Sequence, residues 1–98
     1  HALVIPKAHR EDVLAGEAST ATAVFDTVRT VSQALDAALD PDGFSVFHSS
    51  GPLVGNVDHA HVHVVPRRSD DGVRVSLPRR ALSEREGLRV AAAIRAQF

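Results

Sequence analysis

Apolar residues recur along this chain with two different periods. Between Ser19 and Leu39 they are three or four positions apart, which is typical of an amphipathic helix with one buried face. These positions are Ala21, Val24, Phe25, Val28, Val31, Leu35, Ala38 and Leu39. The Asp-Pro-Asp-Gly sequence of residues 40–43 then stops the helix with turn-forming residues. A long helix is therefore predicted over residues 19–39.

Short segments rich in β-branched and aromatic residues predict strands. They cover residues 3–5, 44–48, 61–66 and 73–77. Pro6 ends the first segment and Pro78 closes the last, because proline cannot donate to a sheet ladder. Residues 49–58 contain glycine and proline and are predicted as a loop.

A second helix is predicted at the C-terminal end. Ser83 and Glu86 match a capping box, in which each side chain bonds the backbone N–H of the other residue. Apolar residues follow at helical spacing toward Phe98; they are Leu88, Ala91, Ala92 and Ile94.

Length and composition indicate a single domain spanning residues 1–98. Hydrophobic residues make up 44% and charged residues 23% of the chain, as is usual for a soluble protein. The absence of cysteine excludes disulfides and thiolate metal sites. No apolar run approaches the ~20 residues of a membrane span and no signal peptide is visible, so a cytoplasmic location without a membrane partner is expected.

Charge is unevenly distributed along the chain. The net charge of −1 argues against a nucleic-acid partner. Residues 1–66 carry three basic and eight acidic side chains, a net charge of −5, whereas residues 67–98 carry eight arginines and four acids, a net charge of +4. Arg67 and Arg68 either attract a polyphosphate or form a solvated surface.

The segment 59–65 (His-Ala-His-Val-His-Val-Val) places three of the six histidines at two-residue spacing. In an extended strand alternate side chains share a face, so the three imidazoles stand in a row at intervals of about 6.6 Å. Ala60, Val62 and Val64 point the other way, toward a core. A row of imidazoles beside a packed strand calls for a polar partner such as a phosphate or a metal.

Three interpretations of this row are open: idle surface histidines, a metal site, and catalysis at phosphorus. The outer two histidines lie about 13 Å apart, so one zinc ion with bonds of ~2.0–2.1 Å could take at most two of the three. A neutral imidazole is a good nucleophile at pH 7, and flanking imidazoles can bond phosphate oxygens or pass a proton to a leaving group. A linear row therefore suits attack by its middle member.

The row, followed by Pro66 and Arg67, resembles the signature of the histidine-triad family of nucleotide hydrolases and transferases. The segment 1–9 (His-Ala-Leu-Val-Ile-Pro-Lys-Ala-His) is similar to the family's strand that carries a fourth histidine. The resemblance implies an α+β fold: a mostly antiparallel sheet with one long helix and a C-terminal helix. It also implies a homodimer, and a chain that lacks the family's N-terminal strands, which help to form the base and ribose pocket.

The resemblance also implies a role for each histidine. His61 would be the nucleophile that takes the nucleotidyl group, and His63 would hydrogen-bond the same phosphate. His59 would position the phosphate and balance the charge that develops near the leaving group. His1 would orient the three histidines of the row. His9 is expected to be structural or exposed.

The implied substrate is a purine nucleotide conjugate cleaved at its α-phosphate, such as a nucleoside phosphoramidate, an adenylated amine or a dinucleoside polyphosphate. No cofactor is implied. The competing hypothesis is a non-catalytic or metal-binding protein that uses the same histidines.

Three residues, His48, Gly55 and Asp58, depart from the family's pattern. His48 replaces the usual Asn or Gln and is expected either to bind phosphate or to cap its strand. Gly55 replaces a frequent Gln that contacts phosphate or ribose, and Asn56 could substitute for it. Asp58 is an unusual acidic neighbour that could disfavour an anionic substrate or pair with a histidine.

Overall fold

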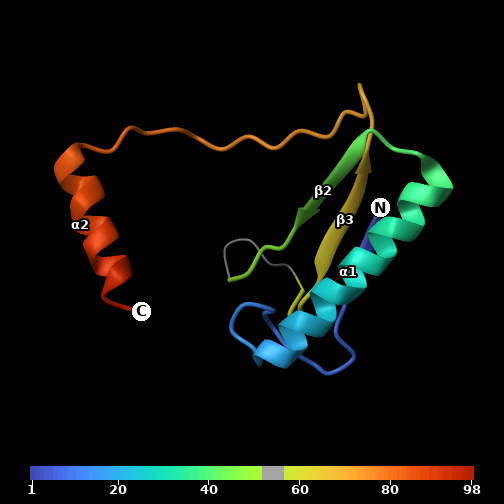
Figure 1. Ribbon diagram of the computed structural model, residues 1–98, viewed down its shortest axis with the longest axis horizontal. Coiled ribbons are helices and arrows are strands. Elements are labelled where there is room, and N and C mark those ends of the chain that lie inside the picture. Colours follow the sequence, from blue (N-terminus) through green and yellow to red (C-terminus); the bar gives the residue numbers. More distant parts are fainter. Residues whose placement is uncertain (52–56) are drawn as a thin grey trace.

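The computed structural model describes residues 1–51 and 57–98 and has the expected α+β fold (Figure 1). Its elements, in chain order, are β1 (Ala2–Val4), α1 (Ala18–Leu39), β2 (Gly43–Phe47), β3 (Val62–Arg67) and α2 (Glu84–Arg95). The predicted long helix and the first three predicted strands are confirmed to within one residue at their ends.

The three strands form one antiparallel sheet in the order β1–β3–β2. Leu3 and Phe47 are the register partners of His63 on either side, and Val4 is opposite Val62. Since side chains alternate along a strand, His63 shares a face with Leu3 and Phe47, and Val62 lies on the opposite face. The strand of the histidine row is therefore the centre of the sheet.

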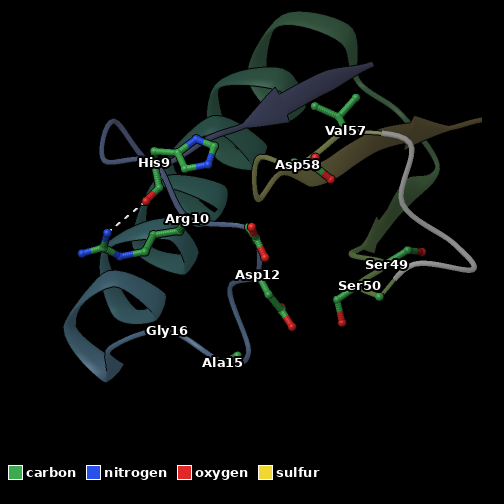
Figure 2. Close-up of a pocket in the computed structure, with 11 residues that line it drawn as sticks. His9, Arg10, Asp12, Ala15, Gly16, Ser49, Ser50, Val57 and Asp58 are labelled. Atoms are coloured by element: carbon green, nitrogen blue, oxygen red, sulfur yellow. Dashed lines mark hydrogen bonds between the residues drawn. The ribbon is translucent and has the colours of Figure 1, made fainter.

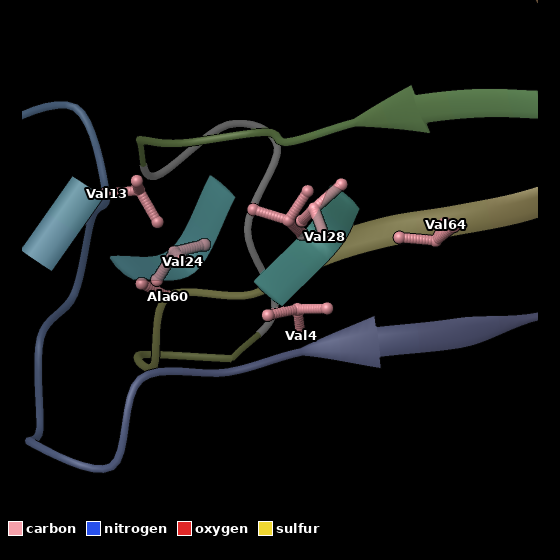
Figure 3. Packing of buried hydrophobic residues seen from close by; sticks show 7 residues of the cluster. Val4, Val13, Val24, Val28, Ala60 and Val64 are labelled. Carbon is pink, nitrogen blue, oxygen red and sulfur yellow. The ribbon is translucent and has the colours of Figure 1, made fainter. Parts of the chain in front are cut away.

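Helix α1 covers the face of the sheet opposite His63, and the core between them consists mainly of valine (Figure 3). Its buried members are Val4, Val13, Val24, Val28, Ala60, Val62 and Val64. Val62 and Val64 are fully buried. The helix takes its place through this packing rather than through a terminal cap, since its N-cap residue Glu17 makes no side-chain bond. None of the helices in the described ranges is long and apolar enough to cross a membrane.

Two arginines at the end of β3, Arg67 and Arg68, fix the turn that leads out of the sheet. The guanidinium of Arg67 donates to the Asp71 carboxylate, with 2.6 Å between Nε and Oδ2, and to Ser45 Oγ at 2.8 Å. Arg68 donates to the Leu39 carbonyl at the end of α1. The hydrogen bond from Arg67, with further bonds from backbone N–H groups, holds the pKa of Asp71 far below its usual range. Both arginines are thus engaged within the protein.

The predicted strand over residues 73–77 is wrong. Residues 71–83 have no regular secondary structure and extend away from the sheet (Figure 1). Together with the helix that follows them they form an arm, residues 71–98. Val75 and Leu77 are 74% and 79% exposed. The alternation of apolar and polar residues is that of a strand, but a strand forms only where another strand satisfies its backbone hydrogen bonds.

The arm ends in α2, whose predicted capping box is confirmed. Ser83 Oγ accepts from the Glu86 N–H at 3.2 Å, and Glu86 Oε2 accepts from the Ser83 N–H at 3.0 Å. The helix lies well apart from the sheet and α1 (Figure 1). It has no buried residue, and its apolar side chains Leu88 and Ile94 are more than half exposed.

Candidate active site

The histidine row enters β3 from its N-terminal side. His59 and His61 precede the first residue of the strand, Val62, and His63 lies inside it. Buried and half-exposed positions alternate without a break from His59 to Val64, with Ala60, Val62 and Val64 in the core. The histidines therefore lie on the side of the chain that α1 does not cover.

His61 is held by its own neighbour in the row. Its Nδ1 lies 2.8 Å from the carbonyl oxygen of His59. A carbonyl can only accept a hydrogen bond, so Nδ1 carries the proton and donates. In the neutral ring the lone pair is then on Nε2, which is the form that a nucleophile requires.

His63 is held by a residue from each neighbouring strand region. Its Nδ1 lies 2.9 Å from Nε2 of His1, which directly precedes β1. Phe47 of β2 stacks on the His63 ring with centroids 4.3 Å apart. Burial, assisted by the nearby His61 and His48, lowers the pKa of His63. The ring is therefore neutral at neutral pH.

His59 joins the row to the end of β1. Its Nε2 lies 2.9 Å from the carbonyl oxygen of Pro6 and donates to it. The ring of His9 meets that of His59 edge-on, with centroids 5.2 Å apart. His9, expected to be structural or exposed, is thus an exposed residue beside the row.

His48 lies directly after β2 and contacts two distant parts of the chain. Its Nδ1 lies 2.9 Å from the carbonyl oxygen of His61, and its Nε2 lies 3.0 Å from Oδ1 of Asp12. The His48 side chain is only 8% exposed. Sequence analysis did not identify Asp12, because it lies 36 residues from His48 in a segment without regular structure.

These two contacts shift the pKa values of both partners. Burial opposes the charge on His48, but the hydrogen bonds to the Asp12 carboxylate and the His61 carbonyl outweigh it and raise the pKa of His48. The hydrogen bond from His48, followed by that from the Leu14 N–H, lowers the pKa of Asp12. Both shifts favour the charged forms of the pair, an imidazolium and a carboxylate.

A cleft of about 590 Å³ lies beside Asp58, the residue directly before the row (Figure 2). Asp12 and the exposed Asp58 line it, with residues of the segment before α1 and of the chain after β2. Gly55 and Asn56, expected to contact phosphate or ribose, lie outside the described residues. Within residues 1–51 and 57–98, no group of three or more His, Asp or Glu side chains is arranged to hold a metal ion.

The fold and the histidine row agree with the family that the sequence resembles. The profile described as "HIT domain" matches residues 1–70, which run to the turn after β3. This match covers most of the chain, so the protein belongs to the HIT domain family.

Similar proteins include two named enzymes and a solved structure. An adenylylsulfatase of Arabidopsis thaliana is 32% identical over 72 residues, which are 72% of this chain and 36% of that protein. An adenosine 5'-monophosphoramidase of Schizosaccharomyces pombe is 28% identical over 88 residues, 88% of this chain and 63% of that protein. A HIT family protein from Bacillus anthracis superposes with a TM-score of 0.85 at 27% identity, covering 98% of this chain and 71% of its own. The chain thus spans about a third to two thirds of the length of the two enzymes.

Proposed function

We propose that this protein cleaves nucleotide conjugates at the α-phosphate, with Nε2 of His61 as the nucleophile. The observation that carries the proposal is the hydrogen bond from His61 Nδ1 to the His59 carbonyl, which leaves the Nε2 lone pair free. Membership of the HIT family and the names of the two related enzymes support a nucleotide hydrolase.

The reaction proceeds by two displacements at phosphorus. In the first, the Nε2 lone pair of His61 forms a bond to phosphorus, and the bond from phosphorus to the leaving group breaks as that group takes a proton. We assign the transfer of that proton to His59, whose Nε2 is bound to the Pro6 carbonyl and would exchange this partner for the leaving group. In the second, water attacks phosphorus, the bond to His61 breaks and a nucleoside monophosphate is released.

His63 and His1 act together on the phosphate. If Nε2–H of His1 donates to Nδ1 of His63, the neutral ring of His63 keeps its own proton on Nε2. That proton is then available to a phosphate oxygen. The proposed role of His1 is to set the tautomer of His63.

An amine is the preferred leaving group in this proposal. Residues 1–66 carry a net charge of −5, which disfavours a polyphosphate tail. Asp58, directly before the row, lines the cleft. Its carboxylate favours an amine, which is released neutral and then protonated to a cation, over a group that leaves as an anion. Nucleoside phosphoramidates and adenylated amines are therefore preferred over dinucleoside polyphosphates.

Incubation with adenosine 5'-phosphoramidate tests the proposal. We expect release of adenosine monophosphate, and loss of this release in His61→Ala with an unchanged circular dichroism spectrum. A His61→Ala variant that hydrolyses as fast as the parent would show that the nucleophile is elsewhere. A stoichiometric metal that is lost on substitution of His59 or His61 would instead support the metal-binding alternative.

We also propose that the protein is a homodimer in which each arm, residues 71–98, packs on the body of the second copy. The accessible surface is 7979 Å², against about 5400 Å² for a compact chain of 10.4 kDa. The excess of about 2600 Å² exceeds the ~800 Å² that each partner buries in an interface of standard size. The radius of gyration, 16.9 Å, likewise exceeds the ~13 Å of a compact domain of this length.

Charge supports the same partner, and the solved relative supports the extended position of the arm. Residues 71–98 carry six arginines and three acids, a net charge of +3, and residues 1–70 carry five basic and nine acidic side chains, a net charge of −4, so the arm of one copy complements the body of another. The match to the Bacillus anthracis structure covers 98% of this chain, so it includes the arm.

A further inference from the structure

The backbone of His61 lies where the pairing of β2 with β3 stops. The last register pair of the two strands is Phe47 with His63. His48 is the next residue of the chain, and its side chain reaches the His61 carbonyl at 2.9 Å. A side-chain bond thus occupies the place of the next ladder bond, directly at the proposed nucleophile.

Both ring nitrogens of His48 face groups that can only accept. One partner is the backbone carbonyl of His61, and the other is the carboxylate of Asp12. Each nitrogen must therefore donate, so the arrangement requires the doubly protonated imidazolium. A neutral His48 could keep only one of the two bonds.

We propose that His48 and Asp12 form a positioning pair that fixes the backbone of His61 for nucleophilic attack. This inference rests on the proposed function. The main-chain carbonyl of His61 is bound by His48, and its side-chain Nδ1 is bound to the His59 carbonyl. With its backbone carbonyl and its Nδ1 both bound, the His61 ring holds a single orientation, in which the Nε2 lone pair points toward the phosphate. Small displacements of a nucleophile cost large factors in rate, about 100-fold for 1 Å.

The pair makes the site sensitive to alkaline pH. The titratable groups that act on the His48 ring or respond to it are Asp12 from the segment before α1 and His63 from the row, while His61 contacts the ring through its backbone carbonyl. Loss of the proton from His48 breaks one of its two bonds and releases either Asp12 or the His61 backbone. Where the family usually carries an amide, which does not titrate, this chain carries a group that does.

The test compares kcat and KM for adenosine 5'-phosphoramidate between about pH 5 and 10 in four proteins. These are the parent, Asp12→Asn, His48→Asn and the control Asp26→Asn, which removes the same charge from an exposed position of α1. In the parent and the control, kcat should fall on the alkaline side. Asp12→Asn should lower kcat about tenfold with little change in KM and move the alkaline fall to lower pH. His48→Asn should remove that fall, because asparagine keeps a donor for His61 but does not titrate. Unchanged kcat profiles in both variants would overturn the proposal.

Nitrogen NMR of the histidine rings separates this inference from the proposed function. If the parent releases no monophosphate, the proposed function fails, and the spectra alone decide whether the pair positions His61. We expect His48 protonated on both nitrogens and His61 in the Nδ1–H tautomer in the parent. In Asp12→Asn the His61 tautomer should persist, because the His59 carbonyl fixes it, while His48 loses one proton and the carbonyl carbon signal of His61 shifts. A His61 carbonyl signal that is identical in the parent and in Asp12→Asn would overturn the positioning role whether or not the protein is active.

Discussion

Nδ1 of His61 lies 2.8 Å from the carbonyl oxygen of His59, two residues earlier in the same row. The spacing that aligns the imidazoles thus also brings a backbone acceptor to the middle ring. A local contact fixes the tautomer of His61, whereas the rings of His63 and His48 depend on partners from distant parts of the chain. The histidine row itself therefore fixes the tautomer of its middle ring, without help from distant residues.

His63 should titrate below the ordinary histidine value of 6.5. Burial is the main cause, and the charges of His61 and His48 add to it. We expect His48→Asn to raise the titration midpoint of His63, because it removes one of those charges. Proton NMR of the imidazole signals as a function of pH measures both values. A midpoint at or above 6.5 in the parent would contradict the described surroundings of this ring.

Asp12→Asn should destabilise the fold most between about pH 4 and 6.5. The raised pKa of His48 gives stability that is complete below the unfolded value of 6.5 and is lost as pH rises through the folded value. The lowered pKa of Asp12 gives stability that is present above the unfolded value of 3.8 and is lost as pH falls. Urea midpoints of the parent and the variant, measured across this range, should converge at alkaline pH. A constant difference at all pH values would argue against the ion pair.

Val64→Ala should lower the free energy of unfolding by about 2 kcal/mol, because it removes two methyl groups from the core. Val64 is fully buried between the sheet and α1 (Figure 3). Val57→Ala is the matched control, since Val57 is 60% exposed and should cost less than about 0.5 kcal/mol. If urea denaturation showed the same loss of unfolding free energy for both variants, the core would not lie between the sheet and α1.

The arm should hold two copies of the protein together. Light scattering behind a sizing column should give about twice the chain mass of 10.4 kDa. Ile94→Arg, on the exposed apolar side of α2, should shift the protein toward the monomer, whereas Gln97→Arg adds the same charge after the helix and should not. A parent mass of 10.4 kDa would contradict the packing of each arm on a second copy. Small-angle scattering of that monomer would then show whether the arm extends as in Figure 1 or packs on the body of its own chain.

Local patterns predicted most of the fold. The helical period of residues 19–39 and the alternation of residues 59–64 have one apolar face each, and both faces meet in the core. The same alternation misled over residues 73–77, because a pattern of side chains does not show whether another strand is present to pair with.

The site was predictable only in part. The row and its link to His1 follow from the motif, since the segments of His1 and His63 become neighbouring strands. The pairing of His48 with Asp12 could not be predicted, because it depends on how the segment between β1 and α1 folds back to β2. Such contacts between distant segments arise from the tertiary fold rather than from local spacing.

The central claim is that His61 bonds to phosphorus, and a trapped intermediate tests it most directly. The protein would be mixed with adenosine 5'-phosphoramidate, quenched within milliseconds under conditions that preserve phosphoramidate bonds, and digested for mass spectrometry. We predict an adenylyl group on the peptide that contains residues 59–63, located on His61 and absent in His61→Ala. An active protein in which the adduct sits on another residue, or in which His61→Ala still forms it, would contradict this account.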